Sequence, residues 1–135
     1  MVVIEKTVEA QLEKCEELTN LVETTLSPYD PSPKAVIQVN VAIDEIFSNI
    51  VRYSGSPTIT IHAQYDEPTG QFSLKFIDSG KPYDPLKKED PDVSLSAENR
   101  QIGGLGIFLV KKTMDDVRYE RIDNQNYFTI YKKMK

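Results

Sequence analysis

The chain contains only one cysteine, one histidine and no tryptophan in 135 residues. A single cysteine, Cys15, excludes an internal disulfide framework, and its place on an apolar helical stripe indicates a small core residue. The one histidine, His62, has no second histidine or cysteine at ligand spacing, so we interpret it as a surface residue. The sequence also lacks a long apolar run, because its N-terminal residues acquire charge within a few positions. We therefore expect neither a signal peptide nor a membrane span, and a cytoplasmic protein without membrane contacts.

The remaining composition is ordinary for a folded domain, with 39% hydrophobic and 27% charged residues. A chain of this length can bury one proper core and is too short for two, so we expect a single domain over residues 1–135. The formal net charge of −5 and the lack of a basic stripe with interleaved aromatics argue against a nucleic-acid partner.

The most strongly marked element is the stretch from Ser32 to Gly55, which predicts a helix with both ends defined. Ser32 is a favourable N-cap, Pro33 suits the first helical position, and Ser54-Gly55 provides the stop. Apolar residues recur at helical spacing and cover more than half of the circumference: Val36, Ile37, Val39, Ile43, Ile46, Phe47, Ile50, Val51 and Tyr53.

A narrow polar strip remains on this helix, formed by Gln38, Glu45, Ser48, Asn49 and Arg52. One interpretation is a solvated face with a single Glu–Arg contact. The other is a functional strip, since a carboxylate can polarise a hydroxyl, an amide oxygen can bind a hard cation, and a guanidinium can bind phosphate. The helix alone leaves both interpretations open.

The other predicted elements are a strand over Val2–Thr7, an acidic amphipathic helix over Val8–Leu26, a strand hairpin of Thr58–Tyr65 and Gln71–Ile77, a helix over about Gly104–Asp116, and strands over Val117–Ile122 and Tyr127–Met134. The second hairpin strand runs directly into Asp78-Ser79-Gly80, which is either an ordinary turn or a carboxylate at the floor of a pocket. Residues 83–102 lack periodicity, as expected for a lid or a disordered loop. The Gly103–Gly106 stretch that follows is either a flexible hinge or a phosphate-binding helix N-terminus.

The order of these motifs resembles the GHKL (histidine-kinase-like) ATPase superfamily. Glu45 and Asn49 match its N box, Asp78 and Gly80 its first glycine box, and Gly104 and Gly106 its second. Within the superfamily, the segments DSGKPYDPL and GGLGIFLVKKTMDDVRYER are most similar to the stand-alone anti-sigma factor serine kinases. The resemblance implies an α/β (α+β) two-layer sandwich of the Bergerat type, with a mixed, mostly antiparallel sheet, helices on one face and an ATP lid at about 83–102.

The resemblance also implies a role for each matching residue. Glu45 would be the general base on the acceptor hydroxyl, and Asn49 would ligate Mg²⁺. The adenine would be bound by Asp78, with Gly80 making room for the base and Thr129 assisting. The phosphates would contact the backbone of Gly104, Leu105 and Gly106, together with Arg52 and Arg100. Tyr53 departs from the family pattern, because many relatives carry histidine there.

The function implied by the resemblance is that of an ATP- and Mg²⁺-dependent serine/threonine protein kinase. It would phosphorylate a STAS-domain anti-sigma antagonist and bind a sigma factor or another regulated protein, and the family suggests a homodimer. The alternative is a nucleotide-binding regulatory module that acts by binding alone; the intact Glu45 argues against it. The sequence does not separate sigma factors from other targets.

Overall fold

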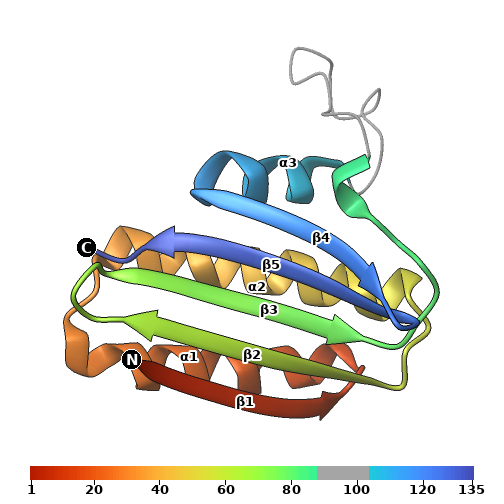
Figure 1. Ribbon diagram of the computed structural model, residues 1–135, viewed down its shortest axis with the longest axis horizontal. Helices are drawn as coiled ribbons and strands as arrows, with labels where there is room; N and C mark the ends of the chain where they lie inside the picture. Colours follow the sequence, from red (N-terminus) through yellow and green to blue (C-terminus); the bar gives the residue numbers. More distant parts are fainter. Residues whose placement is uncertain (88–103) are drawn as a thin grey trace.

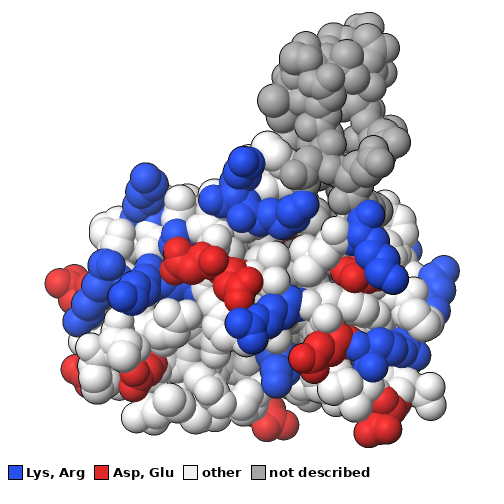
Figure 2. Space-filling view, turned by 45° about the horizontal axis from the view of Figure 1, so that its top comes forward, with Lys and Arg blue, Asp and Glu red and all other residues white. Residues whose placement is uncertain are grey.

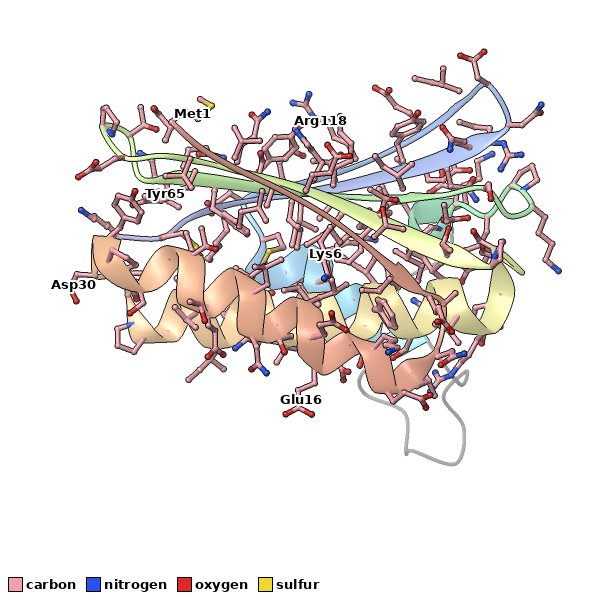
Figure 3. All side chains as sticks on the ribbon, turned by 90° about the horizontal axis from the view of Figure 1, so that it is seen from below. Met1, Lys6, Glu16, Asp30, Tyr65 and Arg118 are labelled. Atoms are coloured by element: carbon pink, nitrogen blue, oxygen red, sulfur yellow. The ribbon has the colours of Figure 1, made fainter. Side chains whose placement is uncertain are left out.

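The computed structural model describes residues 1–87 and 104–135, and it arranges them in two layers (Figure 1). In chain order the elements are β1 (Val2–Glu9), the 3₁₀ turn η1 (Leu12–Lys14), α1 (Cys15–Leu26), η2 (Ser27–Tyr29), α2 (Pro33–Tyr53), β2 (Thr58–Asp66), β3 (Gln71–Asp78), η3 (Pro85–Lys87), α3 (Gly104–Thr113), β4 (Asp116–Ile122) and β5 (Gln125–Lys133). The strands form one layer and the helices cover one face of it, as the view along the sheet shows (Figure 3). This confirms the expected two-layer α/β architecture.

The five strands form one sheet in the order β1-β2-β3-β5-β4. Each of the four pairings is antiparallel, so the described strands contain no parallel neighbours, although we expected a mixed sheet. The β2–β3 and β4–β5 pairs are hairpins, and α3 carries the chain across β5 to reach β4 at the edge. Since side chains alternate along each strand, one face of the sheet packs on the helices and the other remains uncovered.

The longest helix, α2, runs behind the sheet roughly along its strands (Figure 1), and its buried residues belong to the hydrophobic core. Its N-terminus is capped as the sequence predicts, because the Ser32 hydroxyl accepts a hydrogen bond from the Ala35 N–H at 3.4 Å. Ile43 and Phe47 are fully buried against the sheet residues that alternate inward, such as Ile61. The firm placement of α2 matters for function, because it presents the predicted polar strip at a defined position.

Several element boundaries differ from the sequence prediction. The first helix does not begin at Val8, because Val8 belongs to β1 and pairs with Ile59 of β2. The buried stripe of α1 consequently consists of Cys15, Leu18, Val22 and Leu26, while Leu12 lies half exposed in η1. The third helix ends at Thr113, and β4 already begins at Asp116. On α2, Ile37 is 65% exposed, so the apolar surface of this helix is wider than its buried face.

The face of the molecule in Figure 2 carries basic side chains that are interrupted by acidic ones and by uncharged surface. No helix in residues 1–87 or 104–135 has the combined length and apolarity needed to cross a bilayer.

Candidate functional site

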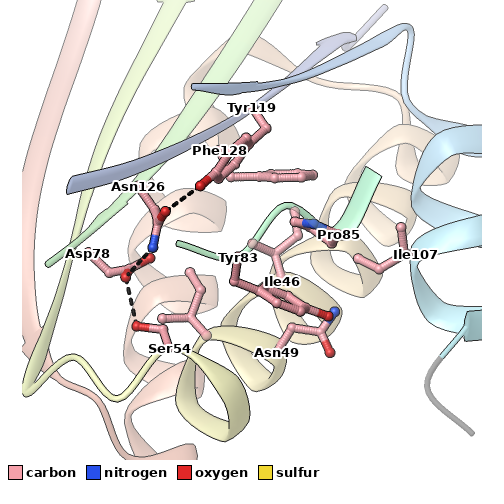
Figure 4. A pocket seen from close by; sticks show the side chains of 11 residues that line it. Ile46, Asn49, Ser54, Asp78, Tyr83, Pro85, Ile107, Tyr119, Asn126 and Phe128 are labelled. Atoms are coloured by element: carbon pink, nitrogen blue, oxygen red, sulfur yellow. Dashed lines mark hydrogen bonds between the residues drawn. The ribbon is translucent and has the colours of Figure 1, made fainter. Parts of the chain in front are cut away.

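A pocket lies between the C-terminal half of α2, the adjoining ends of β3 and β5, and the first turns of α3 (Figure 4). Apolar side chains form most of its wall, and a few polar groups converge on one side. The lining residues are Ile46, Asn49, Ile50, Ser54, Asp78, Tyr83, Pro85, Ile107, Tyr119, Asn126 and Phe128. An apolar pocket with few convergent polar groups is typical of a small-molecule site.

The carboxylate of Asp78 lies at the end of β3 and is 5% exposed. Three donors converge on its Oδ1: the Ser54 hydroxyl at 2.7 Å, the Asn126 amide at 3.0 Å and the Gly80 N–H at 3.0 Å. None of the hydrogen bonds within the described residues reaches Oδ2. The carboxylate is therefore fixed through one oxygen and keeps the other as an acceptor toward the pocket that it lines.

Asn126 holds this arrangement from the β5 side and is 3% exposed. Its amide nitrogen donates to Asp78 Oδ1 and to the Lys81 carbonyl at 2.9 Å. Its amide oxygen accepts from the Tyr119 hydroxyl at 2.5 Å and from the Arg121 guanidinium at 3.2 Å. With two donors and two acceptors all used, the amide has a single orientation that satisfies the network.

Gly80 follows Asp78 by two residues and lies directly against the end of α2. A Cβ at this position would overlap Oγ and the carbonyl oxygen of Ser54 and would lie 2.6 Å from the Ser54 carbonyl carbon. The neighbouring backbone is bonded to the same residue, since the Lys81 N–H donates to the Ser54 carbonyl at 2.9 Å. The Arg121 guanidinium donates to the Gly80 carbonyl at 2.7 Å. A glycine is required here for close approach of two backbones.

Asn49 points from α2 into the same pocket and is 5% exposed. Its amide nitrogen has no hydrogen-bond partner among the described residues, and the oxygen and nitrogen of an amide can exchange by rotation. Buried polar groups are normally hydrogen-bonded, so the unpartnered amide of Asn49 is consistent with a site that binds a ligand. Within residues 1–87 and 104–135, no three His, Cys, Asp or Glu side chains gather as a metal site. The oxygen of a side-chain amide is one of the ligand types that hard cations accept.

Glu45 lies one turn before Asn49 on α2 and is half-buried. Its carboxylate lies against α3 at Gly106, where a Cβ would overlap Oε2 and Cδ and would lie 3.1 Å from Cγ. Gly106 thus lets the first turn of α3 approach the Glu45 side chain. Arg52, one turn further along α2, is exposed, and no carboxylate of the described chain pairs with it. The simple Glu45–Arg52 contact of the alternative interpretation is therefore not formed.

The predicted phosphate-binding stretch coincides with the start of α3. Gly104 is the first residue of this helix, so the backbone of Gly104, Leu105 and Gly106 forms its first turn, where N–H groups lack intrahelical partners. Arg100 and most of the predicted lid lie outside the described residues. Of the predicted lid, residues 83–87 are described: the Tyr83 ring stacks on Tyr53 with 5.2 Å between centroids, and Pro85 is buried.

Thr129 is not part of this pocket, which corrects the sequence prediction. It lies on β5 opposite Lys75 of β3, whereas Asp78 is opposite Asn126. Since Thr129 is three residues from Asn126 along the strand, it is on the face of the sheet away from the helices, where neighbouring side chains leave it 8% exposed. Asn126 was not predicted as a site residue, because the sequence pattern places the start of the last strand at Tyr127 and Asn126 in the preceding turn, whereas β5 begins at Gln125. From the sequence, Ser54 is predicted only to end the helix.

The sequence matches a family model and individual relatives. The sequence model of the family described as "Histidine kinase-like ATPase domain" matches residues 8–132. The serine/threonine-protein kinase BtrW of Bordetella bronchiseptica is 30% identical over 94 residues, covering 68% of this chain and 66% of BtrW. The serine-protein kinase RsbW of Listeria monocytogenes is 30% identical over 93 residues, covering 64% of this chain and 59% of RsbW. The matched regions thus span less than two thirds of each relative.

Solved structures share the fold at low sequence identity. The RsbU and RsbW domains of Rv1364c from Mycobacterium tuberculosis superpose with a TM-score of 0.69 at 13% identity, covering 99% of this chain and 33% of that chain. The catalytic domain of the histidine kinase ThkA superposes with a TM-score of 0.52 at 15% identity, covering 99% and 98% of the two chains.

Proposed function

Because this chain belongs to the histidine kinase-like ATPase domain family, we propose that it binds ATP with Mg²⁺ in the pocket and phosphorylates a serine or threonine of a partner protein. The observation that carries the proposal is the buried Asp78 carboxylate, fixed through Oδ1 and open at Oδ2, in the same pocket as the incompletely partnered Asn49 amide. The relatives named as serine or serine/threonine protein kinases support the choice of reaction.

The adenine half of the site follows from Asp78. Its Oδ2 accepts a hydrogen bond from the 6-amino group of the base, and the apolar wall, including Ile50 and Phe128, contacts the ring faces. Gly80 keeps the loop close to α2, so that no side chain of its own enters the space for the base.

The phosphate half involves Asn49 and the first turn of α3. Asn49 would hold Mg²⁺ through its amide oxygen, and the ion would neutralise negative charge on the phosphates. The N–H groups at the start of α3, at Gly104, Leu105 and Gly106, bind phosphate oxygens and place the positive end of the helix dipole against them. Arg52 and Arg100 remain proposed phosphate contacts: Arg52 is exposed near the end of α2, and Arg100 is outside the described residues.

Glu45 acts as the general base. It takes the proton from the acceptor hydroxyl while the hydroxyl oxygen bonds to the γ-phosphorus, and the bond from phosphorus to the bridging oxygen of ADP breaks. Its place one turn from Asn49 and beside Gly106 puts the carboxylate next to the proposed phosphate-binding turn. We propose that the acceptor is a STAS-domain antagonist and that the chain also binds a sigma factor or another regulated protein, acting as a homodimer.

The experiment that tests this proposal is titration calorimetry with ATP and Mg²⁺, followed by incubation of the same protein with γ-labelled ATP and candidate STAS proteins. ATP binding together with label on a serine or threonine supports the kinase. ATP binding without transfer to any candidate favours the module that acts by binding alone. No ATP binding overturns the proposed site.

A further inference from the structure

Ser54 is bonded to Asp78, although in sequence it only ends α2. The residue is the C-cap of the helix and is 4% exposed. Its hydroxyl donates to Asp78 Oδ1 at 2.7 Å, the shortest of the three hydrogen bonds on that oxygen, and accepts from the Ser56 N–H at 3.1 Å. Its carbonyl accepts from the Lys81 N–H. Ser54 is therefore bonded on both sides of the Asp78–Gly80 turn.

The three donors on Oδ1 come from three different parts of the chain. Ser54 lies at the end of α2, Asn126 on β5, and Gly80 in the turn itself. A carboxylate held from three directions through one oxygen cannot rotate or shift without breaking hydrogen bonds between buried groups. The direction in which Oδ2 faces the pocket is thus set by these three partners. Among them, Ser54 can lose its donor with the smallest change in volume, because Ser54→Ala removes a single oxygen atom.

A carboxylate with a fixed direction can distinguish two purines. The 6-amino group of adenine donates a hydrogen bond, so it pairs with Oδ2. The 6-oxo group of hypoxanthine accepts hydrogen bonds and opposes the carboxylate, and its nearest donor is the N1–H, one ring position away. A carboxylate that is free to move can reach that donor, whereas one that is clamped cannot.

We propose that Ser54 is a positioning residue that sets the selectivity of the pocket for 6-amino over 6-oxo purines by holding Asp78 in one orientation. The inference rests on the proposed function, that is, on binding of a purine nucleotide at Asp78.

The test measures the dissociation constants of ATP and of inosine triphosphate, which differs from ATP only at the 6 position and the adjacent ring nitrogen. Both are titrated with Mg²⁺ into the wild type, Ser54→Ala and Ser56→Ala. Ser56 is the matched control, because it is also a buried serine, at 7% exposure, but its hydroxyl contacts Thr58 and Ser79 and not Asp78. Thermal melts of all three proteins establish that each is folded.

We expect the dissociation constant of inosine triphosphate divided by that of ATP to fall about tenfold in Ser54→Ala, which is the effect of one hydrogen bond to a charged group. The same ratio should stay unchanged in Ser56→Ala. An equal loss of affinity for both nucleotides in Ser54→Ala would overturn the inference, since it would indicate a structural role only. An unchanged ratio in that variant also overturns it. If the wild type binds neither nucleotide, the proposed function itself fails. If the wild type binds ATP and Ser54→Ala gives either of the two contradicting results, only the inference about Ser54 fails.

Discussion

The backbone of Gly106 lies so close to the Glu45 carboxylate that a Cβ at position 106 would overlap Oε2 and Cδ. The contact joins the first turn of α3 to the middle of α2, and it connects two sequence motifs that are about sixty positions apart along the chain. A helical position normally favours alanine over glycine by about 1 kcal/mol, so retention of glycine here costs helix stability. The close approach gives the physical reason for that cost.

The variant Gly106→Ala separates the effect of this contact on folding stability from its effect on phosphotransfer. Because the end of a glutamate side chain can rotate away, we expect the free energy of unfolding to stay within about 1 kcal/mol of the wild type. The displaced carboxylate no longer reaches the acceptor hydroxyl, so the rate of phosphotransfer falls at least about tenfold. Urea denaturation and transfer of label from γ-labelled ATP measure the two quantities.

The control for this prediction is the same substitution in a Glu45→Ala background. There the obstacle is absent, and Gly106→Ala should cause no further loss of transfer. An additional loss in the double variant would mean that alanine at 106 acts on the phosphate contacts and not through Glu45.

The variant Gly80→Ala is expected to behave differently, because its obstacle is mainly backbone. The added Cβ meets the carbonyl group of Ser54 as well as its hydroxyl, and neither the end of α2 nor the turn can move without breaking the bonds to Asp78 and Lys81. We expect a loss of about 1–3 kcal/mol in the free energy of unfolding, together with weaker ATP binding. Equilibrium denaturation beside Gly106→Ala tests the contrast, and equal stability of the two variants would contradict it.

Two variants should separate ATP binding from phosphate transfer: Asp78→Asn and Glu45→Ala. In Asp78→Asn the oxygen that receives three donors is kept, but an amide N–H replaces the free acceptor Oδ2 and opposes the 6-amino group of adenine. We expect ATP binding to be lost in this variant, whereas Glu45→Ala should bind ATP and fail to transfer phosphate. Calorimetry with ATP and Mg²⁺ decides the first point, and full ATP affinity in Asp78→Asn would refute the assignment of the adenine site.

Much of the fold could be predicted from local patterns. The two ends of α2 follow from Ser32, Pro33 and Ser54, and the core face of the β2–β3 hairpin follows from the alternation of apolar residues. The junction near Val8 could not, because its apolar side chain fits both a strand and a helix, and only pairing with Ile59 selects the strand. The adjacency of Glu45 and Asn49 was predicted, because the two residues lie one turn apart on one helix. The network around Asp78 was not, because it depends on the register between β3 and β5 and on a contact with the end of α2.

Cys15 gives a prediction about pH. Burial, with smaller contributions from the negative charge of Asp44 and from the hydrogen bond to it, raises the pKa of the Cys15 thiol to about 12. The folded chain therefore holds this proton more tightly than the unfolded chain, whose thiol has a pKa near 9.0. The resulting stabilisation is complete below about pH 9 and is lost as the pH rises toward 12.

Two measurements check this behaviour of Cys15. The free energy of unfolding should decline more steeply between pH 9 and pH 12 in the wild type than in Cys15→Ala. A thiol reagent at pH 8 should react much more slowly with the native protein than with the urea-unfolded chain, since the thiolate is the reactive form. Asp44→Asn should relieve only part of the effect, because burial is its largest cause. Rapid reaction of the native thiol would contradict the prediction.

The pair Asn126 and Thr129 tests the corrected composition of the adenine site. Asn126→Ala removes the donor to Asp78 Oδ1 and leaves the Tyr119 hydroxyl and the Lys81 carbonyl without their partner, so we expect ATP affinity to fall about tenfold or more. Thr129→Ala should leave ATP affinity unchanged, because the threonine lies on the uncovered face between Lys75 and Arg118. Calorimetric titration of both variants measures the difference. A loss of affinity in Thr129→Ala alone would restore the sequence-based assignment and would require the last strand to pair in another register, since a shift of one residue exchanges the two faces.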